Sequence, residues 1–202
     1  IAFKFLVWDT DGSYGESVFR QYYARQAQAA MIVADITRPT TIDTILKALA
    51  PAVPHLIPAA HKGDMGGCSF FGFRDDGSRF LLMNIFGGGW GGRPNEDGED
   101  AAVSVCQGDV RNTPVELQEI KYPVLVETHA LRADSGGDGK HRGGLGVELT
   151  YKLLQKCKAN INLDRTRDPP WGLHGGEPGA VNECVIRRAD GRPLPLLPRT
   201  TM

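Results

Sequence analysis

The chain has 202 residues, of which 41% are hydrophobic and 23% are charged, and its formal net charge is -1. This length suffices for one large domain or two small ones with a sizeable buried core. The nearly neutral charge argues against nucleic-acid binding, which usually needs a basic surface. No apolar run approaches the ~20 residues that cross a bilayer. We therefore expect a globular, cytoplasmic protein that binds neither nucleic acid nor membrane.

Glycine, proline and cysteine are the informative residue types. The 25 glycines and 13 prolines show no period and predict many turns and close backbone passages, which disfavours a helical bundle. The four cysteines are widely and irregularly spaced, at Cys68, Cys106, Cys157 and Cys184. Without a CxxC pair a structural zinc site is not expected, and reduced thiols are the favoured interpretation.

The first quarter of the chain predicts a strand followed by helices. Residues 1–9 alternate loosely and favour a strand, and residues 16–30 have a helix-compatible composition. Residues 31–36 suit either a strand or a continuation of that helix. The clearest helix is expected over residues 37–50, where apolar side chains recur at helical spacing before Pro51 ends the pattern.

The rest of the chain favours strands. Residues 68–86 read as a hairpin, because two aromatic-rich runs flank the polar turn at residues 75–78. Further strands are expected over residues 124–132, 146–154, 157–163 and 183–188, and Gly191-Arg192 has the character of a hairpin tip. The fold class is therefore α+β, a strand-rich mixed fold with glycine-rich connecting loops, and a subdomain break is placed near residues 87–123.

The densest glycine cluster is GGGWGG at residues 87–92. It lacks the GxxxxGK[ST] pattern of a phosphate loop, and no GxGxxG opens a helix. The favoured interpretation is a tight crossing of two backbones that leaves no room for a Cβ atom. Arg93 and Asp97 follow directly, either as an ion pair or as substrate contacts.

A second cluster runs from Asn112 to Glu119. A helical turn would place Glu116 and Glu119 on one face, where paired carboxylates can perform acid/base chemistry or bind a hard cation. The alternative is a helix start, with Thr113 as cap, Pro114 at the first helical position and Glu116 completing a capping box.

Two later segments combine glycine with charged or aromatic residues. Residues 132–146 could hold an anion through backbone amides and Arg142. Alternatively they form an ordered connection whose glycines take positive φ and whose Asp134 accepts amide hydrogen bonds. In residues 164–176, Trp171 either faces a ligand or subunit or covers the edge of the core. The five histidines form no metal-binding motif.

Three long motifs carry a family resemblance. In chain order they are NTPVELQE, YPVLVETHALRADSGGDGKHRGGLGVE and PPWGLHGGEPGA. They resemble the C-terminal half of the hydantoinase B/oxoprolinase family, which is related to subunits of acetone and acetophenone carboxylases. GGGWGGRPNEDG and the helix before it fit the same region. The resemblance implies that residues 1–202 are a C-terminal fragment of a hydantoinase B-like domain.

The resemblance also implies a function. Family members work in a hetero-oligomer with a hydantoinase A-like ATP-binding subunit and open cyclic amides such as hydantoins or 5-oxoproline, through a phosphorylated intermediate. The alternatives are a subunit of an ATP-dependent ketone carboxylase and a non-catalytic structural subunit. ATP and magnesium are expected on the partner, without which this chain is expected to be inactive. A divalent metal is expected in the full-length subunit, with its ligands outside this segment.

The residues singled out for the site divide into two groups. The candidate catalytic residues are Glu116 and Glu119. The candidate substrate-binding or supporting residues are Arg93, Asp97, Asn112, Asp134 and Arg142. No arrangement of an activated nucleophile is visible among them.

Overall fold

The structure is a computed structural model that describes residues 39–62, 66–103, 111–188, 191, 193–195 and 200–201. The elements expected over residues 1–36 lie outside the described residues. The chain divides into two compact units, Ile1–Pro58 and Ala59–Met202. The break placed near residues 87–123 remains a prediction. Over the described ranges, no helix has the length and apolar character needed to span a bilayer.

The first unit contains the helix α2, Pro39–Leu49. It confirms the helix expected over residues 37–50. Ala48, Leu49 and Ala50 are buried, and Lys47 lies in the last turn, where a cation interacts favourably with the helix dipole. The helix ends where Pro51 has no backbone N–H to donate.

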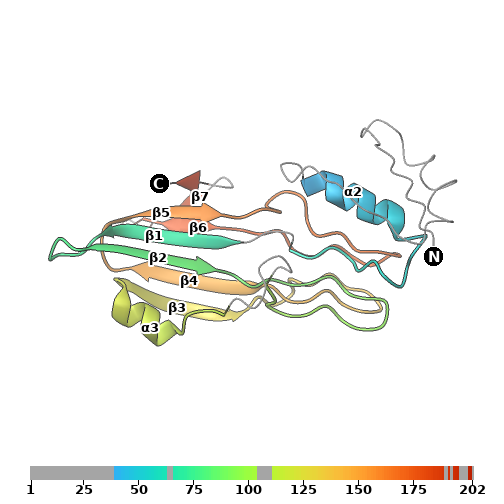
Figure 1. Cartoon of the computed structure of the whole chain (residues 1–202), viewed down its shortest axis with the longest axis horizontal. Helices are drawn as coiled ribbons and strands as arrows, with labels where there is room; N and C mark the ends of the chain where they lie inside the picture. The colour runs from blue at the N-terminus through green and yellow to red at the C-terminus, as the bar shows by residue number, and fades with distance from the viewer. Residues whose placement is uncertain are drawn as a thin grey trace, which may run out of the picture. The chain divides into compact units, whose positions relative to one another are not determined.

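The second unit is built on an antiparallel sheet in the order β2-β1-β5-β8 (Figure 1). Its strands are β1 Gly67–Phe73, β2 Arg79–Ile85, β5 Cys157–Asn162 and β8 Thr200–Thr201. The predicted hairpin is confirmed, because β1 and β2 pair along all seven residues. At its tip Gly77 has φ 80°, a conformation that glycine adopts without strain.

Two smaller antiparallel ladders and a short helix complete this unit. Strands β3, Val124–Leu131, and β4, Val147–Leu153, pair with one irregularity between Val126 and Thr128. Strands β6, Val185–Arg187, and β7, Pro193–Pro195, form a hairpin with Gly191 between them at φ 78°. Helix α3, Val115–Lys121, precedes β3. The fold is α+β, as predicted, and all four later strands are confirmed.

Alternation along the strands places one set of apolar side chains in a common core. The buried members are Cys68, Phe70, Phe80, Leu82, Val124, Ala159 and Ile161. Tyr151 packs edge-on against Phe70, with 5.2 Å between ring centroids. Burial raises the pKa of the Cys68 thiol to about 12, so this cysteine stays a neutral core residue. Cys68, Cys157 and Cys184 are free thiols, and Cys106 lies outside the described residues.

A chain of polar side chains crosses this core. Asn84 Nδ2 donates to Tyr151 Oη at 2.7 Å, and Tyr151 Oη donates to Gln118 Oε1 at 2.7 Å. Gln118, only 1% exposed, then donates from Nε2 to the carbonyl oxygen of Thr113 at 2.7 Å. Burial, opposed by the bond from Asn84, raises the pKa of Tyr151 to about 12. A neutral phenol therefore links β2, β4 and α3.

Candidate functional site

The glycine-rich motifs gather in one region of the second unit, which we call the glycine bundle. It comprises residues 59–62, 87–92, 98–102, 136–146 and 172–179. In Figure 1 these residues form long connecting segments that continue beyond the strand ends. Apart from an isolated bridge between Gly88 and Ala102, these segments contain no strand pairing within the part of the chain that the structure describes. Their packing instead follows a three-residue repeat along residues 87–92.

The first face of that repeat meets residues 59–62. A Cβ atom on Gly88 would lie within 3.1 Å of three carbons of Lys62, and one on Gly91 would overlap the carbonyl group of Ala59. Gly88 and Gly91 are three residues apart, and so are their partners Lys62 and Ala59. The two segments therefore run antiparallel in a fixed register.

The second face meets the segment around His141. A Cβ atom on Gly89 would overlap the carbonyl group of Gly144, and one on Gly92 would overlap that of His141. Again both the glycines and their partners are three residues apart. Each close approach is between backbones, so no side-chain movement could make room.

The third face meets residues 98–101. A Cβ atom on Gly87 would overlap the carbonyl group of Ala101, and the backbone N–H of Trp90 donates to the carbonyl of Glu99 at 3.0 Å. Three faces that repeat every three residues match the periodicity of a polyproline II helix, which has no internal hydrogen bonds and leaves its backbone groups for neighbours. Residues 87–92 thus confirm the prediction of a tight backbone crossing.

The neighbouring segments repeat the same spacing. Gly98 N–H donates to the carbonyl of Arg142 at 2.8 Å, and Ala101 N–H donates to the carbonyl of Leu145 at 2.9 Å. Donors and acceptors are each three residues apart in the same direction. Segments 98–102 and 142–145 therefore run parallel and are joined by one backbone hydrogen bond per turn.

Carboxylates hold the charged ends of these segments. Asp100 binds Arg142 through two bonds, Nη1–Oδ1 at 2.8 Å and Nη2–Oδ2 at 3.1 Å, and also accepts the backbone N–H of Leu145 at 2.7 Å. The bond from Arg142, followed by that from Leu145, lowers the pKa of Asp100. Because the guanidinium is already engaged in a two-bond contact, Arg142 serves first to join segments.

Asp97 makes a second link between the same segments. Its Oδ1 accepts the backbone N–H of Arg142 at 3.0 Å and lies 3.7 Å from His141 Nδ1. Arg93 instead pairs with Glu96, with 2.6 Å between Nη1 and Oε1. The alternative of an Arg93–Asp97 ion pair is therefore wrong. Each residue pairs with a different partner, because the turn at residues 93–96 directs Arg93 back onto its own loop.

The loop after β3 is an ordered connection, but two details of the expectation are wrong. Ser135, rather than Asp134, accepts the backbone N–H of Gly146 at 2.8 Å, and its hydroxyl donates to the Arg132 carbonyl at 2.7 Å. Asp134 itself takes φ 55°, whereas the glycines of this loop do not have positive φ. Gly136 is needed for another reason, since its Cβ would overlap the backbone of Gly143.

The two candidate catalytic carboxylates lie on α3. Glu119 Oε1 accepts the backbone N–H of Val126 in β3 at 2.9 Å, whereas Glu116 is exposed. The capping-box alternative is wrong, because the N-cap is Pro114 and no side chain caps the helix. Proline at the N-cap displaces Thr113 outward, and the Thr113 carbonyl is bound by Gln118 instead. Asn112 is exposed just before this turn.

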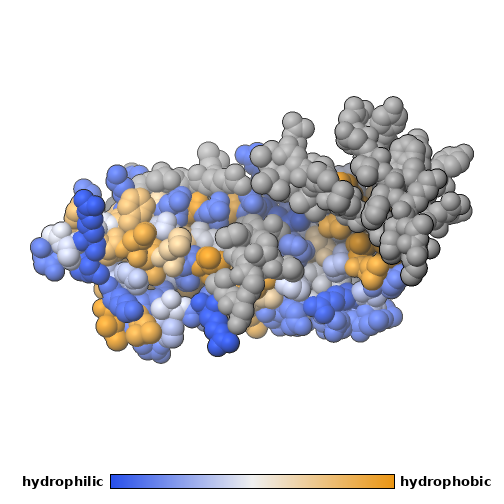
Figure 2. Space-filling model, in the orientation of Figure 1, coloured by the Kyte–Doolittle hydropathy of each residue, from blue (hydrophilic) through white to orange (hydrophobic). Residues whose placement is uncertain are grey.

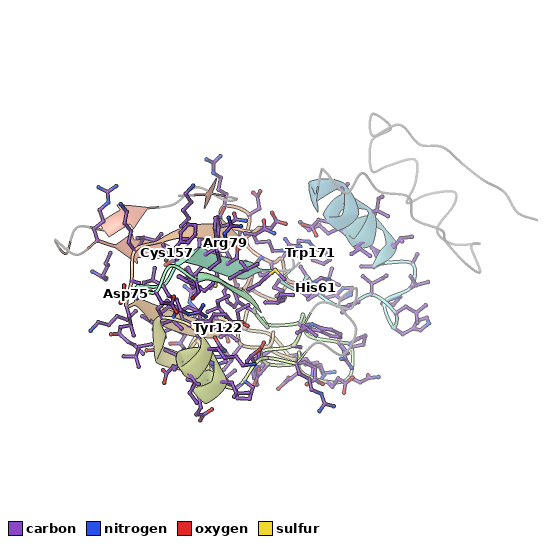
Figure 3. All side chains as sticks on the ribbon, turned by 60° about the vertical axis from the view of Figure 1, so that its left-hand side comes forward. His61, Asp75, Arg79, Tyr122, Cys157 and Trp171 are labelled. Carbon is purple, nitrogen blue, oxygen red and sulfur yellow. The ribbon has the colours of Figure 1, made fainter. Side chains whose placement is uncertain are left out.

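Trp171 lies where the glycine bundle meets the end of the sheet. It is 9% exposed, and its carbonyl accepts the backbone N–H of Ala60 at 3.0 Å. Figure 3 shows Trp171 beside His61, at the opposite end of the β1–β2 hairpin from Asp75. The burial of Trp171 agrees with the interpretation of a side chain that covers the core edge.

Several important residues carry little or no signal in the sequence. Asp100 lies in the acidic run NEDGED, which faces the basic triplet at residues 140–142, and this complementarity of charge could have revealed it. Gln118 and Tyr151 carry no such signal, since only the fold brings them together. Lys62 is 7% exposed and donates from Nζ to the Phe86 carbonyl, and a lone lysine in a loop gives no warning of burial. Within the described ranges, no three His, Cys, Asp or Glu side chains converge on one point.

These features define an α+β protein with a glycine-packed scaffold, and its sequence places it in a family. Residues 23–200 match the Hydantoinase B/oxoprolinase family, and the chain belongs to it. It is 37% identical over 166 residues to an uncharacterised protein of Methanocaldococcus jannaschii, which covers 82% of this chain and 28% of that protein. It is 34% identical over 156 residues to a putative D-/L-hydantoinase B-type subunit of a Pseudomonas species, covering 77% and 26%. The chain thus spans little more than a quarter of these relatives.

Solved structures show the same fold. The ATP-dependent caprolactamase of Pseudomonas jessenii superposes with a TM-score of 0.63 at 25% identity, over 76% of this chain and 28% of that one. A nucleotide-free acetone carboxylase superposes with a TM-score of 0.58 at 20% identity, over 68% and 19%. The α+β architecture is therefore shared by enzymes of both named activities.

Proposed function

We propose that this chain belongs to an ATP-dependent enzyme that opens a cyclic amide. The observation that carries the proposal is the 34% identity, across 77% of the chain, to a protein named as a hydantoinase component. A 5-oxoprolinase of Dictyostelium discoideum is 41% identical over 105 residues. The acetone carboxylase is similar in fold at 20% identity, so ring opening is favoured over ketone carboxylation.

In such an enzyme the glycine bundle serves as a rigid scaffold rather than as a source of reactive groups. Its polar side chains are occupied with one another, as Arg142 is with Asp100 and Asp97 with the backbone of Arg142. Close backbone contacts leave little freedom for relative movement of the segments. Rigid support of this kind is what a reacting geometry requires, because displacement of about 1 Å can cost 10²-fold in rate.

The remaining components are proposed to lie elsewhere in the assembly. An amide carbonyl is a poor electrophile, and ATP can activate it by phosphorylation, so we assign ATP and magnesium to a hydantoinase A-like partner subunit. In the described part of this chain no set of three metal-ligating side chains comes together. We therefore derive no step through a divalent metal on these residues.

The test is turnover by an assembled enzyme that contains this chain and a hydantoinase A-type subunit. Hydantoin, 5-oxoproline and caprolactam are each incubated with and without ATP, and acetone with bicarbonate is assayed in parallel. We expect ATP-dependent ring opening of at least one cyclic amide. Carboxylation of acetone without any ring opening, or ring opening that is independent of ATP, would contradict the proposal.

Glu116 is proposed as the acid/base residue, because it is exposed while Glu119 is bound to the β3 backbone. Glu116→Gln is expected to lower kcat about 10²-fold while leaving subunit assembly intact. Glu127→Gln, an exposed glutamate of β3, is the control and should change neither. Loss of assembly with Glu116→Gln would assign the residue to the scaffold, and full activity would exclude both roles.

A further inference from the structure

The outer face of the β2-β1-β5-β8 sheet divides into an apolar half and a polar half. Outward positions of β1 and β2 carry Phe71, Phe73, Leu81 and Met83, and Phe73, Leu81 and Met83 are 61%, 58% and 70% exposed. Outward positions of β5 carry Lys158, Asn160 and Asn162, all exposed. Figure 2 shows hydrophobic surface over the β1–β2 region, whereas the charged loops at the lower right are hydrophilic.

The apolar half borders an unpaired strand edge. Among the described residues, β2 is hydrogen-bonded to β1 alone and forms the edge of the sheet. Proteins usually protect such an edge with proline, a bulge, inward charges or several lysines. The sequence RFLLMNI has none of these, and its one charged residue, Arg79, lies at the first position. The strand pairs with β1 without a bulge over its whole length.

We propose that β2 pairs antiparallel with β2 of a second copy of this chain, around a two-fold axis at Leu82. Leu82 is the midpoint of Arg79–Ile85, so this register alone pairs all seven residues. Leu81 of each copy then lies opposite Met83 of the other, and both are outward-facing. Directly opposed side chains of this kind stabilise antiparallel pairing.

The charges of the strand agree with the same register. Arg79 lies opposite Ile85 of the second copy, and the two Arg79 side chains lie at opposite ends of the ladder. The inward side chains also match, because Phe80 faces Asn84, whose amide already binds Tyr151. The result is an eight-stranded continuous sheet whose apolar outer stripe is centred on the two-fold axis and whose polar β5 positions lie at its margins.

The experiment is a charge-swap test on the 202-residue chain by size-exclusion chromatography with light scattering over a dilution series. We expect wild type to have about twice the single-chain mass of 22.0 kDa. Leu81→Lys/Met83→Lys places lysine opposite lysine, and Leu81→Glu/Met83→Glu places glutamate opposite glutamate. Each variant alone should be monomeric, with a dimer Kd raised by more than about tenfold, and an equimolar mixture should form a dimer.

Circular dichroism establishes that the variants fold, which exposed positions should allow. Ile120→Lys, at an 80% exposed apolar residue of α3, is the matched control and should remain dimeric. A wild-type monomer at every concentration would overturn the proposal and assign the edge to a different occupant. So would dimerisation of either charged variant alone, a folded mixture that stays monomeric, or dissociation of the Ile120→Lys control.

Discussion

The sheet core and the glycine bundle are ordered by opposite uses of side chains. In the core, alternate residues such as Phe70 and Leu82 fill the interior with apolar groups. In the bundle, residues such as Gly89 and Gly144 allow backbones to touch because no side chain is present. The core gains stability from buried apolar area, whereas the bundle relies on hydrogen bonds and close packing between backbones. The two regions should therefore respond in opposite ways to gain and loss of a few atoms.

The largest effect is expected from removing atoms in the core. Leu82 is 2% exposed, and Leu82→Ala should lower the free energy of unfolding by about 3 kcal/mol through lost burial and a residual cavity. Urea denaturation followed by circular dichroism measures this. Leu81→Ala on the outward face of the same strand is the control and should cost far less. Equal losses for the two would contradict the assignment of the inner face.

The converse change should be nearly as harmful in the bundle. Gly89→Ala adds one methyl group that overlaps the Gly144 carbonyl, and it should cost about 2 to 3 kcal/mol through forced backbone shifts. Gly146→Ala is a matched control in the same region, because its Cβ would meet Ser135 Oγ at an ordinary 3.6 Å. Thermal unfolding of both variants compares them. A Gly89→Ala protein as stable as Gly146→Ala would exclude backbone packing as the basis of the bundle.

A smaller loss is expected where the core contains polar groups. Tyr151→Phe removes one hydroxyl and leaves Asn84 Nδ2 and Gln118 Oε1 without this partner. Unsatisfied buried groups should cost about 2 kcal/mol. The double variant with Gln118→Leu should recover part of that loss, because it removes one of the two orphaned groups. Additive destabilisation in urea titrations would show instead that the three side chains are not coupled.

The smallest effect concerns the charged ends of the bundle and depends on pH. The pKa of Asp100 lies below its ordinary value of 3.8, chiefly because of the Arg142 bond. A lowered pKa stabilises the folded state above the ordinary value, and that contribution disappears as pH falls through the folded-state pKa. The stability difference between wild type and Asp100→Asn should therefore be constant from neutral pH to about pH 4 and shrink below it. Asp75→Asn, at an exposed turn position, is the control, and a difference that grows in acid would contradict the pairing.

The sequence predicts the regular elements better than the contacts between segments. Helix α2, the β1–β2 hairpin and the four later strands follow from local periodicity and turn residues. The pairing of Asp100 with Arg142 joins residues that are 42 positions apart, and no local pattern encodes such a contact. The same holds for Gln118 and Tyr151, whose link depends on where α3 settles against β4. The capping box failed because proline moved the helix start by one residue, a boundary detail that tertiary contacts decide.

The three-residue repeat of the glycine bundle restricts how this region can change length. An insertion of one or two residues between Gly87 and Gly92 would rotate every later position onto the wrong neighbour, so that a bulky residue would replace a glycine at each crossing. An insertion of three residues would preserve the rotational phase and only lengthen the segment by one turn. Evolution of these loops should therefore proceed by triplets of amino acids, a reading frame imposed by geometry rather than by the genetic code.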